Sequence, residues 1–206
     1  MKTILWIVVI LIVIAGMFIA FNSGAPDDVE QAKITDTTEG DNMEESSSLG
    51  IENLEEKINN FDPAKLSLQF TGYGPGKSHV GVFKKYSIRD VEVGSDNITK
   101  GTIVFDMTSV STEIGKLDEH LCTDDFFDCA QYPEATFELG SIKKTGDSKF
   151  EITGKFTMKG ISKDITFNVM QVENKYTADF LLNTNEFGFN VALADSDVRI
   201  NFEIEL

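Results

Sequence analysis

The chain has 206 residues, a length that fits one or two domains. It carries 18 Lys and Arg residues against 34 Asp and Glu residues, which gives a formal net charge of −16. Because nucleic-acid binders neutralise phosphates with Lys and Arg, this acidic chain is not expected to bind nucleic acid. Two His and two Cys residues also exclude most zinc clusters, which use four such ligands at close spacing.

The chain begins with an uncharged apolar run from Ile4 to Phe21, which is just long enough to span a bilayer as a helix. Lys2 precedes the run and acidic residues follow it, so the remainder of the chain should face away from the cytoplasm. We therefore expect residues 1–24 to be a transmembrane anchor, with a cleaved signal segment as the alternative. The expected location is the cell membrane, with a single span and the domain in the periplasmic or extracellular space.

An acidic segment follows the apolar run. Residues 25–56 contain eleven Asp and Glu residues, one Lys and few large apolar side chains. Such a stretch buries too little surface to offset its chain entropy, and repulsion between its charges extends it. We therefore expect residues 25–56 to be a disordered tether, and residues 57–206 to form the globular domain.

From residue 61 onward, apolar and polar residues alternate with a period of two. Strands with one buried face are expected around residues 66–70, 103–107, 150–158, 165–169, 176–182 and 198–206. Turn signals separate several of these runs, including Lys159-Gly160 and Glu173-Asn174. The pattern predicts an all-β fold, an eight-stranded antiparallel lipocalin-like barrel whose interior can hold one small ligand.

One insert, residues 117–133, breaks the β pattern. Leu117 and Leu121 have helical spacing, and Asp124 or Asp125 could cap a second short turn before Pro133. The insert is expected to form one or two short helices that cover an end of the barrel.

The insert contains both cysteines of the chain, Cys122 and Cys129. On one straight helix their Cα atoms would lie about 10.5 Å apart, too far for a disulfide, so a bridge requires a bend between them. We expect the bridge, since two nearby cysteines of an exported chain can staple a long loop. Two buried free thiols are the alternative.

Several sequence blocks resemble the YceI-like family of extracytoplasmic, polyisoprenoid-binding proteins. The blocks are Leu68–Tyr73 with Lys77–Phe83, Ser111-Thr112 with Leu117–Leu121, Asp125–Asp128 with Tyr132-Pro133 and Thr136-Phe137, Ile152–Gly160, and Phe187-Gly188. The most specific is the Asp-Phe-Phe-Asp block that begins at Asp125. The resemblance covers residues 61–206 and implies a lipocalin-like barrel that holds a long apolar chain, without catalysis.

The inward positions of the predicted strands, with His79 and Phe126, are the candidate ligand-binding residues. They are Phe70, His79, Val82, Phe105, Phe126, Phe137, Phe156, Phe167, Phe180 and Phe202. Aromatic walls suit an elongated apolar ligand, such as an isoprenoid or fatty-acid derivative. A barrel packed solid, acting as a structural or protein-interaction domain, is the alternative function.

Other chemistry is not indicated by the sequence. The Gly-rich stretch from Gly72 to Ser78 lacks the first Gly of a phosphate loop and is followed by a strand. His79 and His120 could approach each other beside Asp124 or Asp125, but their spacing matches no known metal site. We therefore expect no enzyme activity, no catalytic residues, no cofactor and no metal. The expected partners are an apolar lipid and the membrane, and a dimer is left open.

Overall fold

The computed structural model describes residues 24–37, 47–49, 53–94 and 97–206. Its elements in chain order are β1 (Lys33–Asp36), α2 (Leu54–Asn59), the 3-10 turn η1 (Pro63–Lys65), β2 (Leu66–Gly74), β3 (Lys77–Phe83), β4 (Tyr86–Val93), β5 (Ile98–Asp106), η2 (Met107–Ser109), β6 (Val110–Ser111), α3 (Gly115–Leu121), β7 (Glu134–Gly146), β8 (Lys149–Met158), β9 (Ile161–Val172), β10 (Lys175–Asn183), η3 (Thr184–Phe187) and β11 (Asp197–Glu205). The fold is all-β with short helical pieces.

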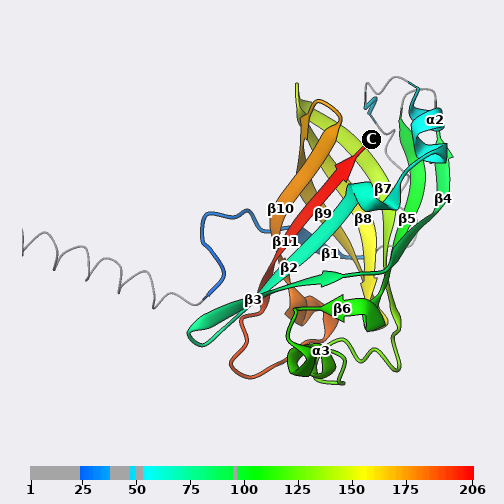
Figure 1. Cartoon of the computed structure of the whole chain (residues 1–206). Helices are drawn as coiled ribbons and strands as arrows, with labels where there is room; N and C mark the ends of the chain where they lie inside the picture. The colour runs from blue at the N-terminus through cyan, green and yellow to red at the C-terminus, as the bar shows by residue number, and fades with distance from the viewer. Residues whose placement is uncertain (1–23, 38–46, 50–52, 95–96) are drawn as a thin grey trace, which may run out of the picture.

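The strands form one strongly curled antiparallel sheet (Figure 1). Ten of them follow one another in the order β4-β5-β7-β8-β9-β10-β11-β2-β3-β6, and β1 joins the sheet by pairing with β9. The hairpin turns use the residues that the sequence indicated: Lys159 and Gly160 both have positive φ, as does Glu173. These turns suit the right-handed twist of the strands that they connect.

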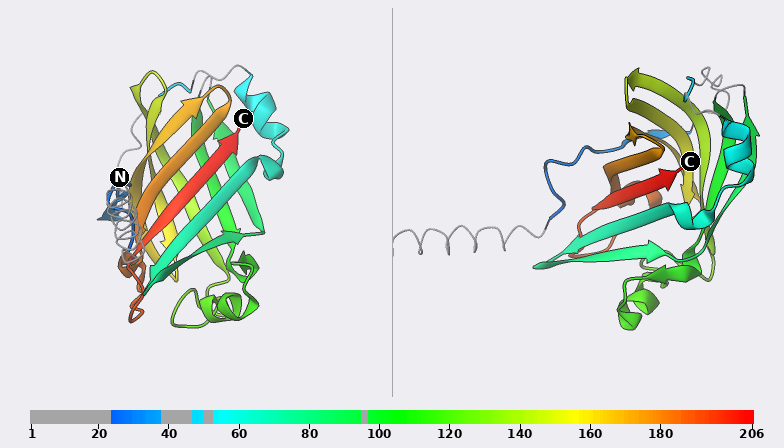
Figure 2. Two further views of the ribbon diagram at one scale, coloured as in Figure 1. Left: turned by 60° about the vertical axis from the view of Figure 1, so that its left-hand side comes forward. Right: turned by 45° about the horizontal axis from the view of Figure 1, so that its top comes forward.

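The expected closed barrel of eight strands is wrong. Within the described residues, no ladder joins β4 to β6, so the sheet keeps two ends and is a curled half-barrel. The reason lies in the bend after Phe83: β3 pairs with the two-residue β6, while β4 turns away and pairs with β5. Beyond β6 no strand remains to close the ladder, and α2 and η1 lie beside this opening (Figures 1 and 2).

The structure also corrects the expected transmembrane helix and, with it, the expected location in the cell membrane. Among the described residues, no helix is long and apolar enough to cross a membrane. The two α-helices, α2 and α3, have six and seven residues, whereas a span requires about 20. The expected span, from Ile4 to Phe21, lies outside the described residues.

Part of the acidic segment is ordered, in contrast to the expected disordered tether. Residues 33–36 form β1, and Ala32 is buried in the apolar core. The segment finds partners that its own composition does not reveal, because β9 and β10 offer it free backbone groups. Residues 38–46 and 50–52 of the expected tether lie outside the described residues, and the domain boundaries remain a prediction.

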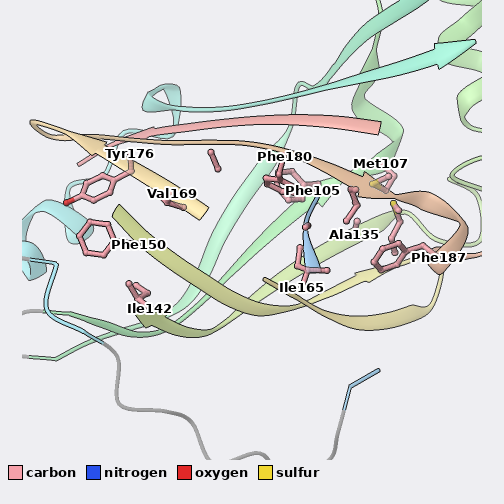
Figure 3. Packing of buried hydrophobic residues seen from close by; sticks show 14 of the residues in the cluster. Phe105, Met107, Ala135, Ile142, Phe150, Ile165, Val169, Tyr176, Phe180 and Phe187 are labelled. Carbon is pink, nitrogen blue, oxygen red and sulfur yellow. The ribbon is translucent and has the colours of Figure 1, made fainter. Parts of the chain in front are cut away.

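The hydrophobic core lies on the concave face of the sheet (Figure 3). Phe150 and Tyr176 occupy one end of it, and Phe187 and Met107 the other. Phe150 and Phe187 are almost completely buried, so each end of the curled sheet is anchored by an aromatic side chain.

Candidate ligand-binding site

A cavity of about 680 Å³ lies inside the curled sheet. Strands β2, β5, β7, β8, β9, β10 and β11 contribute to its wall. Along β10, for example, Tyr176, Phe180 and Leu182 line the cavity, while Asp179 points outward and pairs with Arg199. The alternation of apolar and polar residues thus produces a hydrocarbon interior of the size typical of small-molecule sites.

Nine of the ten expected site residues line this cavity. They are Phe70, His79, Phe105, Phe126, Phe137, Phe156, Phe167, Phe180 and Phe202. Val82 does not line it, because the inward positions of β3 are His79, Gly81 and Phe83. The structure brings the nine together from eight strands and the insert, and their contact with a ligand remains a prediction.

Aromatic rings form much of the wall. Phe167 stacks on Phe180 with ring centroids 4.6 Å apart, and Phe137 lies 5.8 Å from Phe167. Nearer the insert, Phe70 and Phe83 both contact Phe127 at edge-to-face angles. Such contacts add to the burial of each ring and hold the wall in shape without a ligand.

The insert that carries α3 covers one end of the cavity. Leu117, His120, Leu121 and Phe126 line the cavity from this insert, and His120 contacts the Phe126 ring edge-to-face at 5.0 Å. Only the first expected helix is present; residues 123–128 form turns, in which the Phe127 N–H bonds back to the Leu121 carbonyl at 2.9 Å.

This reversal places the two cysteines side by side. Cys122 and Cys129 form a disulfide with their Cα atoms 4.9 Å apart. Both sulfur atoms lie near the backbone carbonyl of Met107, at 3.7 and 3.4 Å. The disulfide therefore lies against η2, between the sheet and the insert.

Polar side chains gather at the same end, around a mouth between the β2–β3 turn and the loop 190–196. The Asp195 N–H donates to the Tyr73 carbonyl at 2.9 Å, which joins the loop to β2. Thr184, Asn185 and Ser196 line the cavity here, and Leu193 is 81% exposed with a positive φ. The sequence reasoning missed this loop because its residues do not alternate.

The opposite end is largely apolar. Leu49, Ile58 and Leu206 line it, and burial raises the pKa of Tyr176 there. The Tyr176 hydroxyl is buried and has no hydrogen-bond partner among the described residues. The cavity is thus amphipathic along its length, with a hydrocarbon end and a mouth rich in hydrogen-bonding groups.

His79 and His120 both line the cavity, on β3 and α3 respectively. Within the described part of the chain, no group of three or more His, Cys, Asp or Glu side chains is placed to hold a metal ion.

Comparison with known proteins identifies the domain. The family model for the YceI-like domain matches residues 60–206. The chain belongs to the YceI-like family. Protein YceI of Escherichia coli O157:H7 is 37% identical over 94 residues, which are 46% of this chain and 46% of that protein. A UPF0312 protein of Pseudomonas putida is 37% identical over 81 residues, 34% of this chain and 42% of that protein. The match therefore spans less than half the length of these relatives.

Several solved structures share the fold. BcnA of Burkholderia cenocepacia superposes with a TM-score of 0.61 at 24% identity, over 69% of this chain and 97% of BcnA. The YCEI protein of Campylobacter jejuni gives a TM-score of 0.53 at 27% identity, over 61% and 82% of the two chains. A domain of Saccharophagus degradans, described as polyisoprenoid binding and implicated in plant cell wall breakdown, gives 0.52 at 16% identity, over 68% and 91%.

Proposed function

We propose that this YceI-like protein binds a long apolar lipid, an isoprenoid or fatty-acid derivative, inside its curled sheet. The observation that carries the proposal is the cavity of about 680 Å³ with its apolar wall. Each methylene group moved from water into such a site contributes about 0.8 kcal/mol, so a long chain is favoured over a short one. The protein acts as a binding protein rather than an enzyme.

The two ends of the cavity differ in polarity, and this difference predicts the orientation of a bound lipid. The end of the cavity around Leu49, Ile58 and Leu206 suits the tail, because these apolar side chains offer a headgroup no hydrogen bond in exchange for its water. Asn185 and Ser196 at the mouth can donate hydrogen bonds to a headgroup, and the Thr184 hydroxyl, which donates to the Ser196 carbonyl, can accept one. His79 also lines the cavity, from the strand that follows the β2–β3 turn.

Family membership supports the proposal, because a structural relative from Saccharophagus degradans is described as a polyisoprenoid binding domain. The alternative function, a barrel packed solid that serves only as a structural or interaction domain, is not favoured. A packed interior leaves few voids larger than a water molecule, and this cavity is far larger.

A single substitution can obstruct the cavity without disturbing the strand that carries it. Gly72 lines the cavity on β2, and a Cβ atom placed there has no neighbour within 4 Å. Gly72→Trp should therefore block the binding of all-trans-retinol, an isoprenoid whose fluorescence reports an apolar site. Thr71→Trp is the matched control, because Thr71 does not line the cavity. Equal retinol affinity of both variants would count against the cavity as the site.

A further inference from the structure

The wall of the cavity contains a seam between β9 and β10. These two strands, both described in full, pair with each other only next to their hairpin, at Lys175–Thr177 against Met170–Val172. By contrast, β8 and β9 pair along almost their whole length. The sheet is therefore split beside residues 161–168 of β9 and 178–183 of β10, where Ile165, Phe180 and Leu182 line the cavity.

The N-terminal segment fills this seam. Residues 33–36 form β1 and pair with residues 163–166 of β9. On the other side, the Ala32 N–H donates to the Leu181 carbonyl and the Leu181 N–H donates to the Glu30 carbonyl, both at 2.8 Å. Figures 1 and 2 show the segment crossing the outside of the sheet at this place. We call residues 25–36 the strap.

Apolar contacts join the strap to the hydrophobic core. Ala32 is 6% exposed and belongs to the hydrophobic core. Ile34 lies directly opposite Ile165 in the ladder and packs against the same core. Since directly paired residues point to the same side of a sheet, Ile34 lies on the same side as Ile165, which lines the cavity.

Polar contacts hold the two ends and the middle of the strap. Asp36 pairs with Lys163 at 2.6 Å, and the Gln31 side-chain amide donates to Asp197 at 2.9 Å. The Ala25 N–H donates to Asp195 at 3.0 Å, so the strap also reaches the loop at the mouth of the cavity. The exposed polar contacts are individually weak, because water competes for both partners.

Two observations set the strap apart from the rest of the wall. It precedes residues 60–206, which match the YceI-like domain, so it lies outside the part of the chain that the family model describes. Its strand has four residues, three of them exposed, whereas the neighbouring β8 and β9 have ten and twelve. Segments with few buried apolar contacts open at a lower free energy than core strands.

We propose that the strap is a removable part of the wall, whose release from the seam opens the cavity sideways and sets the rate at which lipid enters and leaves. This inference rests on the proposed function of the cavity. It assigns a regulatory role to a segment whose composition otherwise resembles that of a spacer.

Locking the strap tests the proposal in the full chain. Thr35 and Asp164 are directly opposed in the ladder, and opposed antiparallel residues lie at a separation that a disulfide can bridge. The double substitution Thr35→Cys and Asp164→Cys should slow the release of all-trans-retinol about tenfold or more, as expected when an opening of low free energy is prevented. Dithiothreitol should restore the rate, with the unsubstituted chain treated in the same way as the control.

Loosening the strap should have the opposite effect. Ile34→Asn removes the apolar contact and should speed retinol release about tenfold, a factor that corresponds to the loss of a partly buried aliphatic side chain. Lys33→Asn is the matched control, because Lys33 is on the same strand with its side chain exposed, and should change the rate by less than about twofold. Equal release rates in the locked, loosened and control chains would overturn the proposal.

An experiment without ligand distinguishes an error in the proposed role of the strap from an error in the proposed function of the cavity. If neither the unsubstituted protein nor any variant binds retinol, the proposed function is wrong. Thiol labelling then tests whether the strap opens the cavity wall. Leu182→Cys places a thiol on the cavity wall beside the seam, and the native cysteines are joined in a disulfide. A bulky maleimide should label Cys at this position faster with Ile34→Asn than with Lys33→Asn. Equal labelling rates would refute the removable wall.

Discussion

Glycine residues on the strands determine how closely aromatic rings approach the sheet. A Cβ atom at Gly81 would collide with the ring of Phe70, which lines the cavity. At Gly154, a Cβ atom would collide with the ring of Phe137 and would lie 2.6 Å from the carbonyl oxygen of Glu138. Backbone cannot move aside as a flexible side chain can, so Gly154 is the more constrained of the two.

Gly154→Ala should lower the free energy of unfolding by about 1–3 kcal/mol, the range for overpacking a closely packed site. Gly72→Ala is the control, since a Cβ atom there has open space, and should change stability by less than about 0.5 kcal/mol. Urea unfolding of both variants provides the measurement. The assignment of Gly154 as a packing residue is wrong if the two variants are equally stable.

One ion pair on the outer surface gives a pH dependence with a definite sign. Arg199 donates to Asp179 from the neighbouring strand at 2.7 Å, and this hydrogen bond holds the pKa of Asp179 below its usual 3.8. A carboxyl group whose pKa is lower in the folded than in the unfolded chain stabilises the fold at pH values above the pKa of the unfolded chain. This contribution is lost as the pH falls through the pKa of the folded chain.

Arg199→Gln should therefore cost about 0.5–1 kcal/mol at neutral pH, a small amount because both side chains are partly exposed. The difference between Arg199→Gln and the unsubstituted chain should shrink as the pH falls below 3.8. Chemical unfolding of both proteins at several pH values measures this difference. If the difference in unfolding free energy stays constant below pH 3.8, the stabilisation by Arg199 does not come from its ion pair with Asp179.

The inward residues could be predicted largely from the period of two, and the exception at β3 has a physical cause. Gly81 occupies an inward position beneath the Phe70 ring but carries no side chain to reveal it. Val82 was therefore assigned to the inner face, although Phe83 is the residue that lines the cavity. The loop at the mouth was missed because irregular backbone has no period.

At the scale of elements, the insert that carries α3 is stabilised by a covalent link. The Cys122–Cys129 bridge closes a short loop that covers one end of the cavity. Because the bridge restricts the unfolded chain, replacing both cysteines by Ser should lower stability by about 2–3 kcal/mol.

Thermal unfolding of the Cys122→Ser and Cys129→Ser double variant measures this loss. A thiol-alkylating reagent, added to denatured and unreduced protein, checks the bridge itself and should modify neither cysteine. Two modified cysteines per chain would contradict the disulfide.

The strand β1 shows why some elements escape prediction from sequence. Residues 33–36 alternate weakly and lie in an acidic stretch, so local composition favours an extended spacer. Their strand conformation depends on free backbone groups of β9 and β10, which are more than a hundred residues away. Pairing over such separations is a property of the assembled sheet.

At the scale of the whole molecule, alternation predicted an all-β fold with a hollow interior but not whether the sheet closes. Closure depends on the bend after Phe83, which sends β3 to the short β6 and β4 to β5. The same inner face serves a closed barrel and a curled half-barrel, so the period of two cannot distinguish them. The resemblance to the YceI-like family, by contrast, was confirmed over residues 60–206.

The most direct test of the account is mass spectrometry of the organic-solvent extract of the purified full chain, with the Gly72→Trp variant as the blank. An apolar wall around a cavity of about 680 Å³ should retain a lipid through purification. We predict a long-chain lipid, near one molecule per chain, from the unsubstituted protein and its loss from Gly72→Trp. Equal amounts of lipid from both proteins, or none from either, would contradict the proposal that the cavity is a lipid-binding site.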